Sequence, residues 1–433
     1  MSKLLIYCLN IRAVFTLALI IRLLLSPESH VDEQRYLWLS DQIVAGNFDL
    51  DAGSFLCAPF FPYFLASLKI ISPQYWSPWL FICQALLSSL CVFCLYQMAL
   101  WLFNNKNIAL LSGFIYAVYL DAFMYVRLIG QETCFQSFLI FSLYFLFDFI
   151  ISNNGWRLVL SAVFFSLSFL TKSFILFWSP FIVLFIFLQK NFSIQQKIRF
   201  SFLYALVCLI FTLPIGMYNL NKHGLYTLSS NGGSFLFWVG NSEYAYTAAV
   251  LKKDYAEVYP EMAARDEVYQ MHNLVPPTAD LNKFLTARKT WGTVQDIQNK
   301  FGQAAWKWVF DNPKKFWILR GYNFVRFLIP GSKSPNAALF TLFFTFLSAG
   351  ILYVAAFLGM IKCLNKQFTK HNWILTLYLT MLIFSIIFGT YIRFRTVTID
   401  SFLILYASFF LYETIQNFKR RWRTTTIHQG RTS

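Results

Sequence analysis

Charged side chains are scarce in this sequence: only 13% of its 433 residues are Asp, Glu, Lys or Arg, whereas about a quarter is usual in a soluble domain. Hydrophobic residues make up 57% of the chain and aromatic residues 20%, which is more apolar surface than one soluble core can hide. The composition argues against a soluble enzyme, a disordered protein and a nucleic-acid binder. It favours a helical integral membrane protein, in which the net charge of +16 collects on the cytoplasmic side.

We also expect neither a disulfide framework nor a cleavable leader. The pair Cys91-x-x-Cys94 lies within an apolar run, where free cysteine packs as a small hydrophobe rather than as a redox or metal pair. The first apolar run, 13–25, is followed by Ser26-Pro27 and not by a small-x-small cleavage site. We therefore expect this run to remain as the first membrane helix.

What the sequence does contain is a series of long apolar runs. A helix needs about 20 residues to cross about 30 Å of hydrocarbon. Ten spans are predicted, near residues 8–25, 76–103, 107–120, 133–152, 156–171, 173–189, 200–217, 336–361, 372–390 and 397–417. The run 60–72 is shorter, begins beside two prolines and contains Lys69, so we interpret it as a helix along the membrane interface.

The distribution of basic residues orients these spans. With the N-terminus inside, the inner loops and the tail carry Lys106, Arg157, Lys190, Lys197, Arg199, Lys362, Lys366, Lys370, Lys419, Arg420, Arg421 and Arg423. This is the positive-inside distribution, and counting 60–72 as a span would turn most of these loops outward.

The topology predicts an all-α polytopic membrane protein in three parts. Residues 1–217 form an N-terminal transmembrane module with outer loops 26–75 and 121–132. Residues 218–335 form a small, mixed outer domain, in which Asn312-Pro313 separates two amphipathic helices with the second starting at the proline. Residues 336–433 hold the last spans and a basic cytoplasmic tail.

Three cations lie on the outer side, where short segments should be poor in them: Lys172, Arg393 and Arg395. Snorkelling toward headgroups explains any one of them. Three together, with no acidic loop to neutralise them locally, point to a site for an anion. Arginine suits phosphate because its planar fork donates two hydrogen bonds at once.

Two acidic positions are expected on the same side. Asp32 and Glu33, after His30, open an amphipathic helix that ends near residue 46; a capped and solvated helix start is the alternative interpretation. Glu132 begins the fourth span, and a carboxylate beside intramembrane helices is a functional candidate. One of the two acids can act as a base, and the other can orient it or a metal.

These motifs occur in a familiar order. They are Arg22, Asp32-Glu33-x-x-Tyr36, Ala58-Pro59-Phe60-Phe61-Pro62-Tyr63, Glu132, Phe169-Leu170-Thr171-Lys172, Asn231-Gly232-Gly233, Gly240-Asn241, Asn312-Pro313 and Arg393-Phe394-Arg395. The sequence resembles, over essentially its whole length, the GT-C glycosyltransferases of the protein O-mannosyltransferase (glycosyltransferase family 39) and lipid A aminoarabinose transferase type. It departs from them at Ala58, where some members carry a basic residue, and after Arg395, where prolines often follow.

The resemblance implies a GT-C bundle and a role for each candidate residue. Asp32 would be the catalytic base, with Glu33 beside it and Glu132 as the second-loop acid. The phosphate and lipid of a polyprenyl-phosphate sugar donor would contact Arg393, Arg395, Lys172 and Tyr36, and the substrate pocket would include His30 and Asn241. No cofactor is firmly implied, and a divalent cation (Mg²⁺ or Mn²⁺) held by Asp32 and Glu132 is one option.

We therefore expect a multi-pass enzyme of a bacterial inner membrane, surrounded by lipids and with no nucleic-acid partner. It would transfer a sugar on the periplasmic face to a lipid, glycan or protein acceptor, with inversion at the anomeric carbon. A transporter or flippase of a lipid-linked glycan is the main alternative, although it should carry midplane charges and paired halves, which the sequence lacks. A scaffold for an envelope complex is a third hypothesis.

Overall fold

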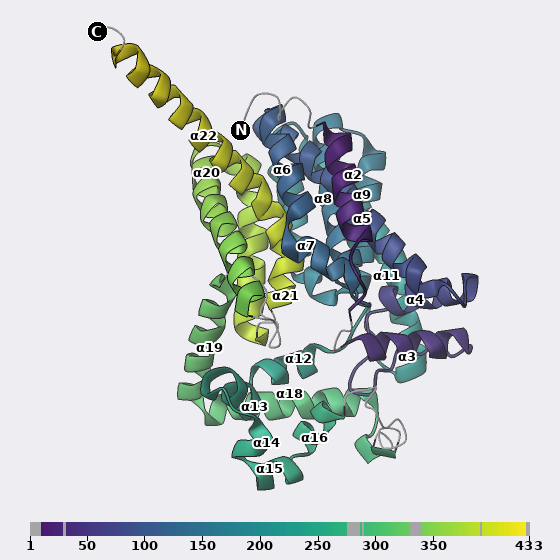
Figure 1. Cartoon of the computed structure of the whole chain (residues 1–433). Helices are drawn as coiled ribbons and strands as arrows, with labels where there is room; N and C mark the ends of the chain where they lie inside the picture. Colours follow the sequence, from purple (N-terminus) through teal and green to yellow (C-terminus); the bar gives the residue numbers. More distant parts are fainter. Residues whose placement is uncertain are drawn as a thin grey trace.

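The computed structural model describes residues 10–28, 32–274, 286–287, 290–329, 339–389 and 392–429, without the side chains of 121, 339–348, 369, 392–393 and 421–429. Within these ranges the secondary structure is helical, with two isolated β-bridges and no strand. The helices form an elongated bundle, with both chain termini at one end and a layer of shorter helices at the other (Figure 1). The predicted helical, polytopic fold is confirmed.

The N-terminal module supplies most of the bundle. Its helices are α2 (Ile11–Leu23), α5 (Trp76–Phe103), α6 (Lys106–Val118), α8 (Glu132–Ser152), α9 (Gly155–Thr171), α10 (Ser179–Phe187) after the 3-10 turn η2 (Ser173–Trp178), and α11 (Ile194–His223). Helices α5, α6, α8 and α9 pack side by side, and α2 lies against α5 and α6.

Paired asparagines turn the chain between consecutive helices. Asn104 and Asn153 end α5 and α8 with positive φ angles of 49° and 54°, a conformation that asparagine tolerates better than most residues. The next residues, Asn105 and Asn154, cap α6 and α9 by accepting backbone N–H bonds on their side-chain oxygens. The same local sequence therefore reverses the chain twice at the end that carries the termini.

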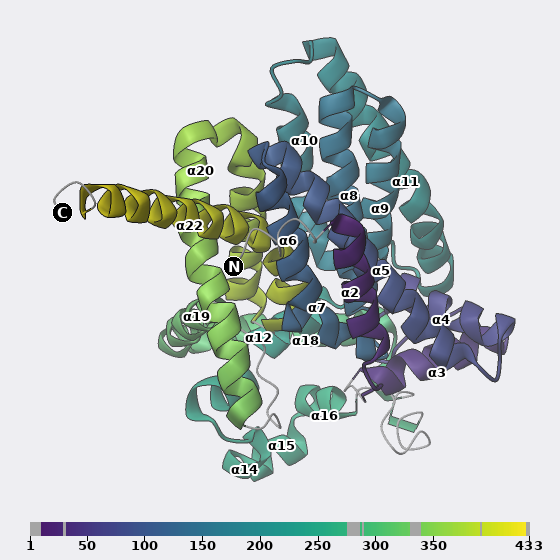
Figure 2. The ribbon, with the colours of Figure 1, turned by 45° about the horizontal axis from the view of Figure 1, so that its top comes forward.

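The C-terminal helices close the bundle. Helix α20 (Leu339–Phe388) is broken at Gln367, where φ is −146°, and α21 (Ile392–Arg395), the π-helical turn η4 (Thr396–Asp400) and α22 (Ser401–Gln429) follow it. Helix α22 packs against both α20 and α6 (Figure 2). The last helix thereby connects the C-terminal helices with the N-terminal module.

Not every predicted span is long enough on its own to cross a membrane. Among the described residues, six helices are both long enough and apolar enough to cross a membrane: Trp76–Phe103, Glu132–Ser152, Ile194–His223, Ala349–Phe368, Lys370–Phe388 and Thr396–Arg420. The predicted spans at 107–120, 156–171 and 173–189 correspond to shorter apolar helices. The count of ten spans stays a prediction.

The predicted outer segments gather at the end of the bundle opposite the termini. They form α3 (Glu33–Val44), α4 (Phe60–Ile71), α7 (Leu120–Met124), η1 (Tyr125–Arg127), α12 (Gly233–Gly240), α13 (Glu243–Tyr246), η3 (Thr247–Leu251), α14 (Tyr255–Val258), α15 (Pro260–Arg265), α16 (Glu267–Asn273), α18 (Val294–Asp311) and α19 (Pro313–Leu328). Helices α3 and α4 lie across the direction of the bundle (Figure 1). Helix α19 starts at the proline, as the sequence predicts.

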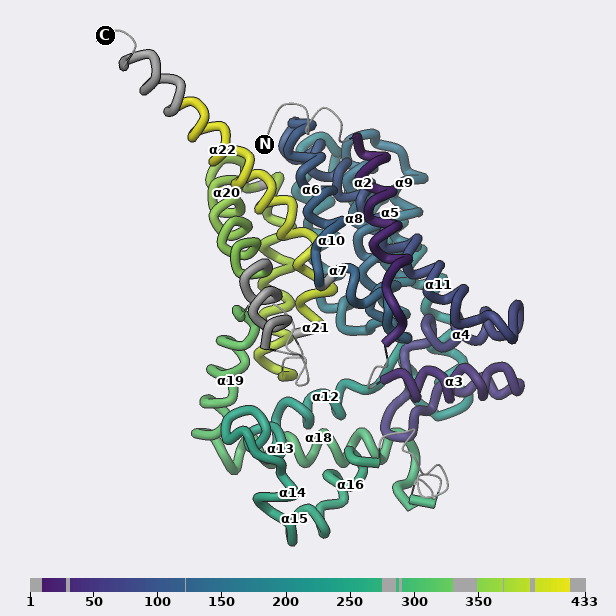
Figure 3. The backbone as a smooth tube through the Cα atoms, viewed as in Figure 1, coloured from purple at the N-terminus to yellow at the C-terminus, as the bar shows by residue number. Residues whose placement is uncertain are grey.

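The predicted outer domain, 218–335, has a core of its own and contacts the bundle through α12 and α19. Its buried centre contains Trp238, Met271, Trp291, Ile297 and Phe301. Helix α12 packs on α18 and on α20, and the tube in Figure 3 shows it between them.

Two side-chain amides hold the first outer loop to this domain. Asn231 Oδ1 accepts the backbone N–H of Leu56 at 2.6 Å, and Gln298 Nε2 donates to the carbonyl oxygen of Ser54. The first loop is therefore placed by the outer domain as well as by the bundle.

Candidate functional site

The two N-terminal outer loops are joined to each other. The carboxylate of Glu28 forms an ion pair with the guanidinium of Arg127 at 2.6 Å. The backbone N–H of Glu28 donates to the carbonyl oxygen of Arg127 at 3.0 Å. Gln84 of α5 fixes the second loop from the other side, because its Nε2 donates to Leu128 O at 3.0 Å. The chain leading to Asp32 and the chain leading to α8 therefore lie together.

Asp32 stands just before α3 and is 9% exposed. Arg35, one turn along the helix, brings its Nη1 within 3.5 Å of Asp32 Oδ1. The next residue, Tyr36, is buried, and the pKa of its phenol is raised well above the usual range, first by burial and then by the negative charge of Asp32, with a smaller contribution from Glu132. The carboxylates of Asp32 and Glu132, from separate loops, therefore both lie near enough to Tyr36 to act on its phenol.

Glu132 is paired with Lys172. The ammonium nitrogen lies 2.8 Å from Glu132 Oε1, and both side chains are 2% exposed. Gly130 makes room for this carboxylate, since a Cβ there would stand 2.7 Å from Glu132 Oε2. The ring centre of Phe394 lies 5.0 Å from the ammonium nitrogen of Lys172. Helix α21, from the C-terminal part of the chain, therefore contacts the ion pair.

Arg395 is buried and held on several sides. Its Nε lies 3.6 Å from Asp400 Oδ1, and its Nη1 donates to the carbonyl oxygens of Phe327 and, at 2.7 Å, Ile329. Asp400 also accepts the hydroxyl of Tyr119 on Oδ2 at 3.0 Å.

The expectation that the outer cations lack local acidic partners was wrong for the two that can be compared. Lys172 has Glu132 and Arg395 has Asp400. The backbone of Arg393 belongs to α21, but its side chain lies outside the described residues. His30 lies outside them altogether.

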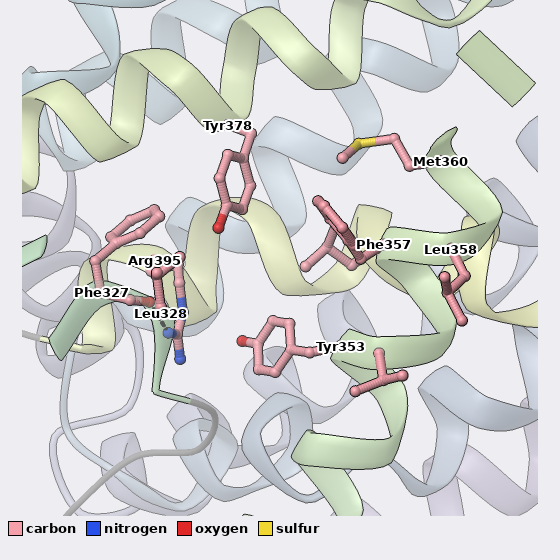
Figure 4. Close-up of a pocket in the computed structure, with 10 residues that line it drawn as sticks. Phe327, Leu328, Tyr353, Phe357, Leu358, Met360, Tyr378 and Arg395 are labelled. Carbon is pink, nitrogen blue, oxygen red and sulfur yellow. Dashed lines mark hydrogen bonds between the residues drawn. The ribbon is translucent and has the colours of Figure 1, made fainter. Parts of the chain in front are cut away.

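An apolar cavity of about 290 Å³ lies beside Arg395. Apart from this arginine, it is lined by Phe327, Leu328, Tyr353, Val354, Phe357, Leu358, Met360, Tyr378 and Leu403, from α19, α20 and α22. Figure 4 shows the guanidinium at one side of the cavity, facing the ring of Tyr353. Val354 and Phe357 are also exposed on the outside of α20, so the cavity borders an apolar outer surface.

Asn241 and Glu33 are the two further candidate site residues. The amide of Asn241 donates to Phe237 O and Ile387 O, both at 2.8 Å, and so ties α12 to the end of α20. Glu33 is the first residue of α3 and is partly exposed. Their predicted roles in a pocket and in catalysis stay predictions.

The predicted divalent-cation site at Asp32 and Glu132 is not evident among the described residues. The ammonium of Lys172 occupies a position beside Glu132, and the guanidinium of Arg35 lies beside Asp32. Throughout the described part of the chain, no group of three His, Cys, Asp or Glu side chains gathers as metal ligands would.

Sequence reasoning missed three members of these networks. Arg35 follows Asp32 at the i+3 spacing that lets side chains meet on a helix, which is a readable signal. Asp400 lies inside an apolar span, where an ionisable residue is a functional candidate by default. Tyr119 carries no signal of its own, because its partner is far away in the sequence.

Comparison with known proteins supports this class of fold. Residues 57–218 match the family described as dolichyl-phosphate-mannose-protein mannosyltransferase. The structure is similar to the archaeal oligosaccharyltransferase AglB from Archaeoglobus fulgidus in complex with an inhibitory peptide and a dolichol-phosphate, with a TM-score of 0.56 and 13% identity over 96% of this chain and 52% of that one. ArnT from Cupriavidus metallidurans in the apo state gives a TM-score of 0.41 and 14% identity, covering 92% of this chain and 76% of that one.

The family match and the fold shared with AglB confirm the resemblance to GT-C glycosyltransferases. The chain spans about half the length of AglB. None of the curated proteins compared with the chain matches it.

Proposed function

We propose that this chain is a membrane glycosyltransferase that moves a sugar from a polyprenyl-phosphate carrier to an acceptor hydroxyl. The observation that carries the proposal is the arrangement of charged groups at one end of the bundle, where acids from two separate loops lie near one buried tyrosine and an arginine lines an apolar cavity. A prenyl phosphate needs both an apolar channel and a cation. The match of residues 57–218 to a family named for a lipid-phosphate sugar donor agrees with this.

The donor would bind at the cavity. Its prenyl chain would contact the apolar residues of α19, α20 and α22, and its phosphate would lie near Arg395 and the neighbouring Arg393. When the sugar leaves, the phosphate gains negative charge. A buried guanidinium stabilises that charge more strongly than it would in water, because little solvent screens it.

Asp32 is a better candidate for the general base than Glu132. Glu132 is 2% exposed and committed to Lys172, whereas the side chain of Asp32 is 12% exposed and stands at a helix start beside Arg35. Asp32 would take the proton of the acceptor hydroxyl as that oxygen bonds to the anomeric carbon and the bond to the phosphate breaks. One displacement inverts the anomeric carbon, and no second carboxylate nucleophile is needed.

Glu132 and Lys172 would then position the groups around them. Their ion pair joins the second outer loop to the end of α9 and lies against Phe394, the residue between the two arginines. The acceptor would be a lipid, a glycan or a protein. We place the reaction on the periplasmic face of a bacterial inner membrane, in keeping with the basic inner loops.

The test is sugar transfer by the purified full-length chain in nanodiscs, with a panel of undecaprenyl-phosphate sugars labelled in the sugar and with solubilised membranes as the acceptor source. We expect Asp32→Asn to lower transfer by at least about 100-fold, the usual contribution of a general base. Asp41→Asn is the matched control, because Asp41 lies on α3, the helix that follows Asp32, but is exposed and paired with Lys69. Normal transfer by a folded Asp32→Asn protein would reject Asp32 as the base.

The same preparation separates an enzyme from a flippase. A flippase would move the labelled donor across a sealed vesicle membrane without transferring the sugar to any acceptor. Translocation with intact donor, unaffected by Asp32→Asn, would therefore contradict the proposed activity and support the transport alternative.

A further inference from the structure

Asp400 is a carboxylate buried inside the last membrane-spanning segment. Its side chain is 0% exposed, and it lies in the candidate span Thr396–Arg420. Ionisable groups at such positions are costly, so they are paired and usually serve a function. The scheme for sugar transfer outlined above gives this residue no role.

The winding of the helix explains how Asp400 reaches Arg395. The two residues are five positions apart, and in an α-helix of 3.6 residues per turn they would point to nearly opposite sides. Here Thr396–Asp400 form a π-helical turn, in which backbone hydrogen bonds span five residues instead of four, so that each turn holds more residues. The turn therefore brings Asp400 Oδ1 to 3.6 Å from Arg395 Nε.

The other oxygen of Asp400 binds a different part of the molecule. Tyr119, at the junction of α6 and α7, donates its hydroxyl to Asp400 Oδ2 at 3.0 Å and is itself 6% exposed. One carboxylate thus joins the guanidinium to the segment that begins the second outer loop. Side-chain networks of this kind fix orientation because each member restrains the next.

These contacts decide where the cation lies. The carbonyl oxygens of Phe327 and Ile329 hold Nη1, Asp400 lies beside Nε, and the guanidinium borders the cavity opposite Tyr353 (Figure 4). Carbonyl oxygens orient the guanidinium without cancelling its charge. A rigidly oriented guanidinium loses less freedom when it binds an anion, which favours binding.

We propose that Asp400, supported by Tyr119, is a positioning residue for lipid-phosphate binding, acting only through the orientation of Arg395 at the cavity. The inference rests on the proposed function, in which Arg395 contacts the phosphate of the carrier. It predicts that neutralising an acid near the site weakens the binding of an anion, although simple charge repulsion would predict the opposite.

The test measures binding of geranylgeranyl phosphate, with geranylgeraniol as the uncharged comparison, to the full chain in nanodiscs. We expect Asp400→Asn to weaken binding of the phosphate about tenfold, the size of a typical coupling between neighbouring charged groups. Binding of geranylgeraniol should not change. Ser401→Ala is the matched control, because Ser401 is the next buried residue and bonds Gln136 rather than Arg395.

A double-mutant cycle distinguishes positioning from a general structural role. Arg395→Met should weaken binding of the phosphate, and adding Asp400→Asn should weaken it no further. Additive effects, or an unchanged Kd in the Asp400→Asn protein, would overturn the inference while leaving the proposed function standing. Absence of any binding of the phosphate by the wild type would overturn both.

Tyr119→Phe covers the case in which Asp400→Asn does not fold. This change removes one hydroxyl and keeps the buried ring. It should weaken binding of the phosphate by a smaller factor than Asp400→Asn and leave binding of the alcohol unchanged. An unaltered Kd for the phosphate in this variant would also count against the inference.

Discussion

The ammonium of Lys172 lies 2.8 Å from Glu132 Oε1, and neither side chain is more than 2% exposed. Forty positions separate these residues, one just after α9 and the other at the start of α8. Their charges compensate each other in a region with little water. The pair explains why one predicted cation and one predicted acid act as a unit rather than as separate ligands.

Breaking this pair on one side should be more harmful than removing both charges. Glu132→Gln or Lys172→Met leaves one buried charge without compensation, so each should lower the free energy of unfolding by about 3–5 kcal/mol. The double variant should recover much of that loss and still transfer no sugar. Unfolding in detergent measures the first effect, and the labelled-sugar assay the second.

Lys362→Met is the control for the ion-pair experiment, because Lys362 pairs with Glu413 at 3.3 Å on the exposed surface. Its loss should change the stability by less than about 1 kcal/mol. A loss in the double variant equal to the sum of the two single losses would mean that the buried pair is not coupled.

Gly240 should not tolerate a side chain. A Cβ there would overlap the carbonyl oxygen of Phe388 where α12 meets the end of α20, and Gly389 beside it has φ of +77°. Arg320 Nη2 donates to Gly240 O and its Nη1 to Ile387 O, both at 2.6 Å, in the same junction. We expect Gly240→Ala to lower the melting temperature and to reduce transfer, because the junction precedes α21.

Gly321→Ala provides the comparison for Gly240→Ala. Gly321 lies within α19, and a Cβ added there meets nothing within 4 Å. Alanine favours a helix over glycine by about 1 kcal/mol, so this variant should be as stable as the wild type or more so. A Gly240→Ala protein as stable as Gly321→Ala would show that the junction is not close-packed.

The outer domain should be less stable in acid because of Glu243. Burial raises the pKa of this carboxyl, but hydrogen bonds from Lys315, Trp308 and Tyr259 outweigh burial and leave the pKa below its usual value of 4.5. A carboxyl whose pKa is lowered by folding stabilises the fold at pH values above its unfolded-state pKa. This contribution is lost as the pH falls through the folded-state pKa.

Comparing wild type with Glu243→Gln tests this dependence on pH. The difference in melting temperature should be constant between about pH 5 and 8 and should shrink as the pH falls below the usual carboxyl range. Hydrogen exchange in α13 and α14 would locate the effect. A difference that does not vary with pH would show that the charge of Glu243 is not involved.

The two ends of α5 should lie on opposite sides of the membrane. This helix has 28 residues, about 42 Å at 1.5 Å per residue, which exceeds the hydrocarbon thickness. Gln74→Cys, before the helix, should react in whole cells with a thiol reagent that cannot cross the inner membrane. Lys106→Cys, after the helix, should react only once the cells are lysed.

We expect the native cysteines to react little with the thiol reagent and so to give a low background in this labelling experiment. The seven in the described residues are buried or partly buried. Reaction of Lys106→Cys but not of Gln74→Cys in whole cells would reverse the proposed orientation and move the candidate site to the cytoplasmic face.

Local signals in the sequence were enough for much of the fold. Apolar runs and their lengths gave the positions of the long helices, and Pro313 gave the start of α19. The acids Asp32 and Glu132 could be assigned to the same side of the membrane from the topology alone. Such features depend on hydrophobicity, chain length and backbone stereochemistry, which neighbouring residues determine.

The tertiary structure alone decided which charges meet. Lys172 and Arg395 look like free cations in the sequence, because Glu132 is 40 residues from the first and a π-helical turn is needed to bring Asp400 to the second. Tyr119 reaches Asp400 from 281 positions away. Electrostatic energy depends on distance and burial, and both are set by how the helices pack rather than by the order of residues along the chain.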